Sequence, residues 1–427
     1  ALSGGMAYEG LNTIATLGTN AIIIINDNDQ SIAKNPKGGI YTALENLRKT
    51  KGQATNNIFK ALGYDYHYLE DGNNLEELIS LFKEVKDIDH PVVLHIYTEK
   101  GKGFKPAEEN HEKFHAGGPF SLETGEYIKK GDVTSTYNGI TSEYLTKKLK
   151  EDPLAVVINA GTPGIVFNRK LREQIGSQFI DVGIAEEQAV TMTTGLAKNG
   201  AKPVWAVLST FLQRTYDQLS HDMALNNQAG VVLVYSASIN SMNDESHLGF
   251  FDIPFLSHIP NFVYLAPTNK EEHLAMLEWA INQNEHPVAI RVPVGSVIET
   301  GEEDKTDYSI LNKNKVEKFG EQVAIFGVGN FYNLAEKVSE QLKLEHNIEA
   351  TLVNPRFLTG LDKELLNSLE DNHKLVVTVE DGIVEGGYGQ TVASYLGNTE
   401  LKVQNYGINK KFYDRYSVEE LMKENGL

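Results

Sequence analysis

The stretch FIDVGIAEEQAVTMTTGLA, from Phe179 to Ala197, predicts a strand that passes directly into a helix. Its opening is apolar, and the text from Glu186 to Gly200 is typical of a helix that ends at a glycine. Glu186 and Glu187 therefore stand at the carboxyl end of the strand and in the first helical turn. They can complement the helix dipole, or one of them can point into the crevice where α/β proteins bind ligands. A carboxyl group held there among apolar neighbours can exchange a proton with a bound heterocycle.

The composition excludes several classes of protein. The 427 residues are enough for two or three domains, and 41% hydrophobic with 23% charged residues is typical of a soluble globular protein. The longest aliphatic run, Ile22 to Ile25, is too short to cross a membrane. The sequence has no cysteine for disulfides or thiolate metal sites, so we expect a cytoplasmic protein. A net charge of −19 argues against nucleic-acid binding, and an anionic substrate would need local cations or a metal.

Strand and helix patterns alternate along the chain, which predicts an α/β protein with mainly parallel sheets covered by helices. Most of the strands are expected to be continuous apolar runs, as in sheets covered on both faces. Residues 102–132 are expected to form a loop or linker, residues 301–320 a charged connector, and the Gly-rich residues 379–396 a structural turn rather than an anion site. The predicted domains span residues 1–132, 133–307 and 308–427.

Polar and aromatic side chains follow several of the predicted strands. The stretch Asn26–Asp29 ends one strand, and such clusters are usually polar turns, although their oxygens also suit Mg²⁺. Phe211 and Arg214 follow another strand. A phenylalanine there is usually core, whereas Phe and Arg together near a carboxylate can form a stacking wall for a flat ring. His115 and His247 fall in loops, where a single histidine is usually surface decoration and a pair is a candidate for acid/base work.

Taken in chain order, these motifs resemble those of thiamine-diphosphate enzymes of the transketolase superfamily, most closely the 1-deoxy-D-xylulose-5-phosphate synthase family. The resemblance covers essentially the whole chain and rests on SGGMAYEGLN, INDNDQSIA, KGKGF, FHAGGPF, DVGIAEEQAVT, STFLQRTYDQ, HLGFFDI and TVEDGIVEGGYG. It implies three transketolase-type domains, which are a diphosphate-binding, a pyrimidine-binding and a C-terminal domain. The implied activity is transfer of a two-carbon unit from pyruvate to an aldehyde. The alternatives are a transketolase-like enzyme with a sugar donor and a non-catalytic subunit that depends on a partner.

The resemblance also implies roles for individual residues. Glu186 matches the carboxylate that contacts N1′ of the aminopyrimidine ring, and Phe211 matches the residue that stacks on that ring. His115 and His247 match active-site histidines, so the implied catalytic residues are these two and Glu186. The implied ligands of Mg²⁺ are Asn28, through its side chain, and Gln30, through its carbonyl. The implied residues that bind thiamine diphosphate are Ala1, Asn28, Lys100, Glu186, Phe211 and Arg214.

The beginning of the sequence departs from the family pattern. The family's Gly-Asp-Gly motif, which carries a metal-ligand Asp, would stand just before Ala1. We expect this motif to come from a partner chain of a split enzyme, or to have preceded Ala1 in a longer or processed chain. The resemblance also implies a homodimer.

The acceptor side departs from the family as well. Leu208 stands where the family has a tyrosine, and Ser236 and Val294 stand where it has arginines that hold the phosphate of glyceraldehyde 3-phosphate. Asn243 takes the place of an aspartate. We therefore expect weak activity on this aldehyde and a preference for an uncharged or differently charged acceptor. The rival expectation is that other cations have taken over, the candidates being Lys100, Lys102 and Arg291.

Overall fold

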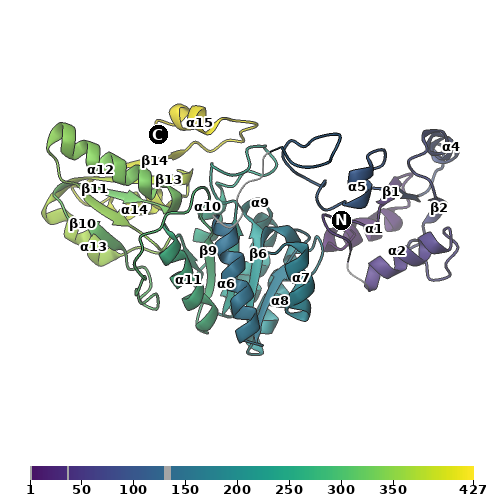
Figure 1. The fold of residues 1–427 in the computed structure, drawn as a ribbon, viewed down its shortest axis with the longest axis horizontal. Helices are drawn as coiled ribbons and strands as arrows, with labels where there is room; N and C mark the ends of the chain where they lie inside the picture. The colour runs from purple at the N-terminus through teal and green to yellow at the C-terminus, as the bar shows by residue number, and fades with distance from the viewer. Residues whose placement is uncertain (1, 36–37, 129–135) are drawn as a thin grey trace. The chain divides into compact units, whose positions relative to one another are not determined.

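The computed structural model describes residues 2–35, 38–128 and 136–427 (Figure 1). It confirms the predicted α/β class, with helices alternating with mainly parallel strands. In the described part of the chain, no helix has the length and apolar character needed to span a membrane. The division into three domains stays a prediction, because the internal contacts separate two compact units. The first unit comprises Ala1–Gly131, Ala160–Pro163 and Asp181–Ala185, and the second Asp132–Asn159, Gly164–Ile180 and Glu186–Leu427.

The first unit is built on a parallel sheet of three strands in the order β1-β3-β2. The central strand β3 alternates between two cores, because Val93 packs with Phe59 on one side and Leu94 with Val85 on the other. β1 is an edge strand among the described residues, and Ile24 on it is 50% exposed. The strands are β1 (Ile22–Asp27), β2 (Asp65–Leu69) and β3 (Val92–Tyr97). The helices are α1 (Gly5–Leu17), α2 (Gly39–Lys49), α3 (Ile58–Ala61), α4 (Leu75–Val85) and α5 (Lys105–Glu109), the last of which lies in the expected linker.

The second unit contains a six-stranded sheet in the order β5-β4-β6-β7-β9-β8, with helices packed around it (Figure 1). Strands β4, β6, β7, β9 and β8 pair in parallel, so their carboxyl ends share one edge of the sheet. The strands are β4 (Ala155–Asn159), β5 (Phe179–Asp181), β6 (Lys202–Leu208), β7 (Gly230–Tyr235), β8 (Val263–Leu265) and β9 (Pro287–Arg291). The helices are α6 (Tyr137–Glu151), α7 (Arg169–Ile175), α8 (Glu186–Lys198), α9 (Ser209–Leu212), α10 (Asp252–Ser257) and α11 (Lys270–Asn282).

The same unit carries a second sheet of five strands in the order β10-β12-β11-β13-β14. All its pairs are parallel except β10 with β12. β10 corrects the expectation of a plain connector at residues 301–320, which missed it because its sequence, KVEK, has no apolar run. The strands are β10 (Lys315–Lys318), β11 (Gln322–Gly327), β12 (Thr351–Asn354), β13 (His373–Ile383) and β14 (Lys402–Ile408). The helices are α12 (Tyr332–His346), α13 (Lys363–Ser368), α14 (Tyr388–Leu396) and α15 (Val418–Glu424).

The Gly-rich segment before α14 is a structural turn, as expected. The carboxylate of Glu380 accepts the backbone N–H groups of Tyr388 and Gly389, each at 3.0 Å. These are donors that a helix start leaves without a partner within the helix. The chain's own glutamate therefore occupies the N-terminus of α14.

A buried ion-pair network joins the two sheets of the second unit. Arg291, at the end of β9, donates from Nε to Asp252 at 2.8 Å and from Nη1 to Asp381 of β13. All three side chains are fully buried. Burial alone lowers the pKa of Arg291, but the two carboxylates reverse the effect and hold that pKa well above its ordinary value. Asp252 also accepts the hydroxyl of Tyr264, so β8, β9, α10 and β13 meet at one charged centre.

Replacing Arg291 by alanine should cost about 3–5 kcal/mol of unfolding free energy, because two carboxylates stay buried without their cation. Denaturant unfolding would measure the loss. The matched control is Arg169→Ala, which removes an exposed ion pair with Glu173 on α7 and should cost less than about 1 kcal/mol. Equal losses in the two variants would contradict the central place of Arg291.

Candidate active site

Glu186 begins α8 as predicted, and its side chain is buried at the edge of the sheet where the parallel strands end. Arg214 forms ion pairs with both members of the Glu pair, with Nη1 2.9 Å from Oε2 of Glu186 and Nη2 3.3 Å from Oε1 of Glu187. The contact with Glu186 lacks hydrogen-bond geometry, so among the described residues Oε2 has no hydrogen-bond donor. Burial raises the pKa of Glu186 above its ordinary value, although its own backbone N–H and Arg214 lower it. The arrangement provides a carboxyl group that can keep or release a proton.

Phe211 and His247 are brought together near this carboxylate's helix. The two rings meet edge to face, with their centroids 5.6 Å apart. Thr210 strengthens the contact, because its hydroxyl donates to the carbonyl of Ser246 at 3.1 Å. Phe211 lies at the carboxyl end of β6 in α9, and His247 lies in the loop between β7 and α10.

His247 is oriented by an acidic neighbour that the sequence alone did not single out. Nδ1 of His247 lies 2.9 Å from Oδ1 of Asp244 and 2.7 Å from the hydroxyl of Ser246. The hydroxyl of Ser246 and the ring of His247 bond to the Asp244 carboxylate and lower its pKa to about 2. When Nδ1 donates to Asp244, Nε2 is the ring nitrogen that remains for a substrate.

The loop that carries His247 closes tightly at its two ends. Ser236 begins it in the left-handed region with φ of +58°. A Cβ at Gly249, where the loop ends, would lie 1.8 Å from the carbonyl oxygen of Ser236. Only glycine fits at that position, so residues 236–249 form a loop with a fixed neck.

A second group of predicted residues gathers in the first unit. Nζ of Lys100 donates to the carbonyl of Ser31 at 2.5 Å and to Nδ1 of His115 at 3.0 Å. Burial and the neighbouring ammonium group lower the pKa of His115, while burial lowers that of Lys100. Lys100 and His115 are therefore brought together beside the loop that follows Asn28 and Gln30.

The loop after β1 is held by ion pairs and hydrogen bonds that the sequence did not predict. Asp27 accepts from Nη1 of Arg48 at 2.5 Å and faces Nε2 of His95 at 2.9 Å, while Asp29 pairs with Arg48 at 3.0 Å. Because the carboxylates of Asp27 and Asp29 are already paired, the ligands of Mg²⁺ must come from the other oxygens of this loop. The sequence carried a signal for the contact of Asp27 with His95, because each is a polar residue in a largely apolar strand, and buried polar residues need partners.

The residues present fit the groups that the motifs imply. For thiamine diphosphate, the observation is the buried Oε2 of Glu186, which has no hydrogen-bond donor among the described residues and lies beside Arg214. For Mg²⁺, Asn28 and Gln30 line a cavity of about 220 Å³, which provides two oxygen donors of the six that the ion requires. The described residues hold no group of three His, Cys, Asp or Glu side chains placed for a metal. Ala1, the remaining predicted contact, lies outside the described residues.

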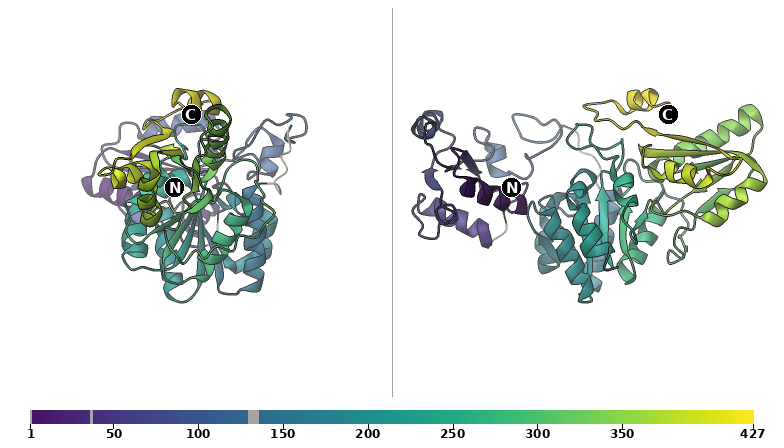
Figure 2. Two further views of the ribbon diagram at one scale, coloured as in Figure 1. Left: turned by 90° about the vertical axis from the view of Figure 1, so that its left-hand side faces the viewer. Right: turned by 180° about the vertical axis from the view of Figure 1, so that it is seen from behind.

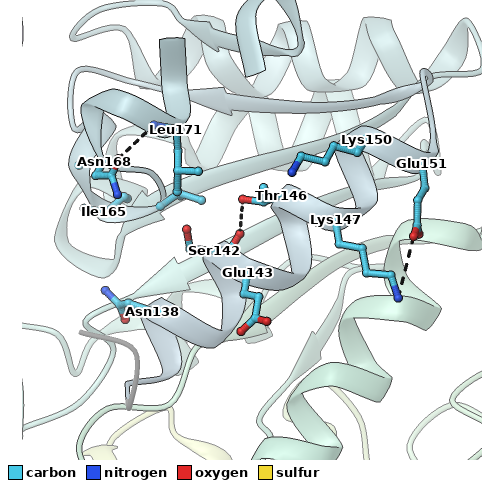
Figure 3. A pocket seen from close by; sticks show the side chains of 13 residues that line it. Asn138, Ser142, Glu143, Thr146, Lys147, Lys150, Glu151, Ile165, Asn168 and Leu171 are labelled. Carbon is cyan, nitrogen blue, oxygen red and sulfur yellow. Dashed lines mark hydrogen bonds and ion pairs between the residues drawn. The ribbon is translucent and has the colours of Figure 1, made fainter. Parts of the chain in front are cut away.

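A surface hollow in the second unit is a different feature. It measures about 760 Å³ and lies between α6 and the segment around α7, lined by side chains such as Ser142, Lys147 and Asn168 (Figure 3). Thr146 donates to the backbone of Ser142, Lys147 pairs with Glu151, and Asn168 caps α7. None of the predicted site residues lines it, so we place the chemistry at Glu186.

Comparison with known proteins identifies the family of the chain. Residues 134–298 match the family model of the transketolase pyrimidine-binding domain, and residues 312–427 match that of the transketolase C-terminal domain. Residues 1–56 and 42–98 match the N-terminal model of 1-deoxy-D-xylulose-5-phosphate synthase. The synthase of Clostridium perfringens (strain SM101) is 36% identical over 464 residues, which span 100% of this chain and 74% of the relative. The synthase of Clostridium acetobutylicum is 37% identical, spanning 99% and 74%.

The chain belongs to the 1-deoxy-D-xylulose-5-phosphate synthase family. It is thus a thiamine-diphosphate-dependent transferase of the transketolase type, as the sequence motifs implied. A solved structure, described as a split gene transketolase in an inactive β4 tetramer, shares the fold with a TM-score of 0.58 at 22% identity. It covers 68% of this chain and 94% of its own.

The positions where this synthase-family chain departs from the family's acceptor site lie at strand ends of the six-stranded sheet. Leu208 ends β6, Ser236 follows β7, and Val294 follows β9, where its backbone N–H donates to Asn330 at 3.0 Å. Arg291, one of the rival cations, is fully buried and engaged by Asp252 and Asp381. This overturns the expectation that Arg291 can meet a substrate phosphate, because its charge is already neutralised inside the protein.

The charges beside Glu186 should shift its pKa in opposite directions when they are removed. Arg214→Met removes a cation that lowers this pKa, so the pKa should rise. Glu187→Gln removes an anion that raises it, so the pKa should fall. Infrared difference spectra of the protonated carboxyl band against pH would measure both shifts, with Glu186→Gln as the blank. Shifts of the same sign in the two variants would contradict the arrangement.

Proposed function

We propose that this chain condenses a two-carbon unit from pyruvate with an aldehyde acceptor. The C1–C2 bond of pyruvate breaks with loss of CO₂, C2 forms a bond to the aldehyde carbon, and the aldehyde oxygen takes up a proton. The observation that carries the proposal is the buried Glu186, whose Oε2 has no hydrogen-bond donor among the described residues and whose pKa is raised. Membership of the 1-deoxy-D-xylulose-5-phosphate synthase family supports pyruvate over a sugar donor, because the methyl group of pyruvate becomes the 1-deoxy carbon of such a ketose.

Each residue of the site has a distinct task in this proposal. When bound, thiamine diphosphate supplies the carbanion chemistry that the protein side chains lack. Glu186 holds or releases a proton at Oε2, and the charge of Arg214 lowers the pKa of that carboxyl and so favours release. Phe211 offers an aromatic face, and His247, with Nδ1 held by Asp244, offers Nε2 to a group on the substrate. In the first unit, Lys100 and His115 supply a cation and a neutral ring.

Glu186→Gln should lower turnover of pyruvate and an aldehyde about 10²- to 10⁴-fold, because an amide cannot exchange the proton. Release of CO₂ and formation of the ketose would be measured together, in the presence of Mg²⁺ and thiamine diphosphate. Glu187→Gln is the matched control, since it removes the neighbouring carboxylate and should keep most of the activity. If Glu187→Gln is the inactive variant, the assignment within the pair is wrong. A parent chain that binds the cofactor in calorimetry but never turns over would favour the non-catalytic alternative.

The acceptor is proposed to be an aldehyde without a phosphate group. Leu208 and Val294 offer no side-chain donor where the family has tyrosine and arginine, and Ser236 offers one neutral hydroxyl. Each charge-assisted hydrogen bond is worth roughly 1.5–3 kcal/mol, so two missing arginines should cost several orders of magnitude in kcat/KM for a phosphorylated aldehyde. Steady-state comparison of glyceraldehyde 3-phosphate with unphosphorylated aldehydes tests this. A clear preference for the phosphorylated aldehyde would overturn it.

Mg²⁺ is proposed to bind beside the loop after β1, with Asn28 and Gln30 as two of its oxygen ligands. The support is the shared cavity and the hydrogen bond from the Gln30 N–H to the side-chain Oδ1 of Asn28 at 3.1 Å, which fixes the loop and the Asn28 amide. Asn28→Ala should weaken binding of thiamine diphosphate only when Mg²⁺ is present, as titration calorimetry with and without the ion would show. Asn73→Ala, in another loop of the same unit, is the control. An identical loss with and without Mg²⁺ would contradict a ligand role.

A partner segment is proposed to cover the edge of the first sheet. The support is β1, an edge strand among the described residues, on which Ile22 is 36% and Ile24 50% exposed while Ile23 and Ile25 pack against the core. Parallel sheets are normally covered, and a bare apolar edge strand invites pairing. We also propose a homodimer. Native mass spectrometry of the chain tests both ideas, since a purely monomeric chain that gains no partner would contradict them.

A further inference from the structure

The loop at residues 236–249, which carries Ser236, Asn243 and His247, is pinned by a segment that belongs to the yellow C-terminal end of the chain in Figure 2. Hydrogen bonds from both sides join the loop to residues 415–416. The backbone N–H of Arg415 donates to the carbonyl of Asn243 at 2.6 Å, and the Asn243 side chain donates to the carbonyl of Tyr416 at 2.9 Å. The hydroxyl of Tyr416 donates to the carbonyl of Ile239 at 3.0 Å. The side chain of Asn243 thus holds the backbone of Tyr416, and the hydroxyl of Tyr416 holds the backbone of the loop at Ile239.

Aromatic packing anchors the segment beneath these bonds. Phe250, which is fully buried just past the neck of the loop, lies 6.0 Å from the ring of Tyr413 and 6.5 Å from that of Tyr416. Tyr413 and Tyr416 also meet edge to face at 6.2 Å. This packing holds the segment at residues 413–416 in place, and the segment in turn supports the loop.

The amide of Asn243 is required for this contact. Its Nδ2 donates to a carbonyl oxygen, which an aspartate at the same position cannot do, because an ionised carboxylate only accepts. A carboxylate would instead face the Tyr416 oxygen at hydrogen-bond distance and be repelled. The departure of this chain from the aspartate of its family thus has a structural reason inside the chain.

We propose that Asn243 and Tyr416 are positioning residues that fix the loop bearing Asp244 and His247, and through it the KM for the aldehyde acceptor. The pairing of Asp244 with His247 lies within four residues of Asn243, so a loop released at Asn243 loses the placement of the imidazole. Side chains held out of position at a reacting site cost large factors in rate. The kinetic part rests on the proposed function, whereas the pinning of the loop does not.

The test compares Asn243→Asp and Tyr416→Phe with the control Arg415→Gln, which removes an exposed guanidinium and keeps the backbone N–H that donates to Asn243. Hydrogen exchange in the purified full chain needs no activity. Amides in residues 239–247 should exchange about tenfold faster in Asn243→Asp, severalfold faster in Tyr416→Phe and unchanged in the control. Unchanged exchange in Asn243→Asp overturns the proposal.

The kinetic readout is the split between the two substrates. The KM for the aldehyde should rise about tenfold in Asn243→Asp and about threefold in Tyr416→Phe, while the KM for pyruvate stays within about twofold. A lower aldehyde KM in Asn243→Asp would make position 243 a substrate contact and overturn the proposal, as would a loss in Arg415→Gln equal to that in Asn243→Asp. If the parent chain shows no turnover, the proposed function fails and the exchange measurement alone decides the pinning.

Discussion

The buried pairing of Arg291 with Asp252 and Asp381 fixes the second unit, because it cannot form unless the two sheets are docked. A guanidinium and two carboxylates leave water together, and that cost is recovered only when all the charges meet in one geometry. The loop that carries His247 leads directly into α10, whose first residue is Asp252, so one part of the candidate site is attached to this centre. Loss of the arginine would therefore be felt at the site as well as in the stability of the fold.

The fold was largely predictable because its strands are covered on both faces. Continuous apolar runs such as those of β7 and β9 are buried along their whole length, which makes them visible in the sequence. β10 escaped because an edge strand of alternating charge and a single valine has no such signature. The helix at Glu186 was predicted in its correct place, because an apolar strand gives way there to helix-forming residues.

The candidate site was predictable only in part, and the limit lies in long-range pairing. Motifs identified Glu186, Phe211 and His247, since their residue types and order carry the resemblance. Nothing local announces that Arg291 is neutralised by Asp252 and Asp381, which lie 39 and 90 residues away along the chain. Such roles depend on which elements the topology brings together, and spacing along the chain does not contain that information.

The acceptor side of the site that we propose has two layers. One consists of loops of the six-stranded sheet, and the other of residues of the five-stranded sheet and its C-terminal extension that support those loops. The loops after β7 and β9, which we propose face the substrate, are each held from the five-stranded sheet or the segment that follows it. Val294 donates its N–H to Asn330, which in turn donates to Asp381 at 3.0 Å, while the loop after β7 rests on Tyr416. An arginine at position 294 would add a charge to a loop whose backbone is already tied to the Arg291 network. On the acceptor side that we propose, the residues that support the two loops, Asn243 and Asn330, therefore matter as well as those that touch the substrate.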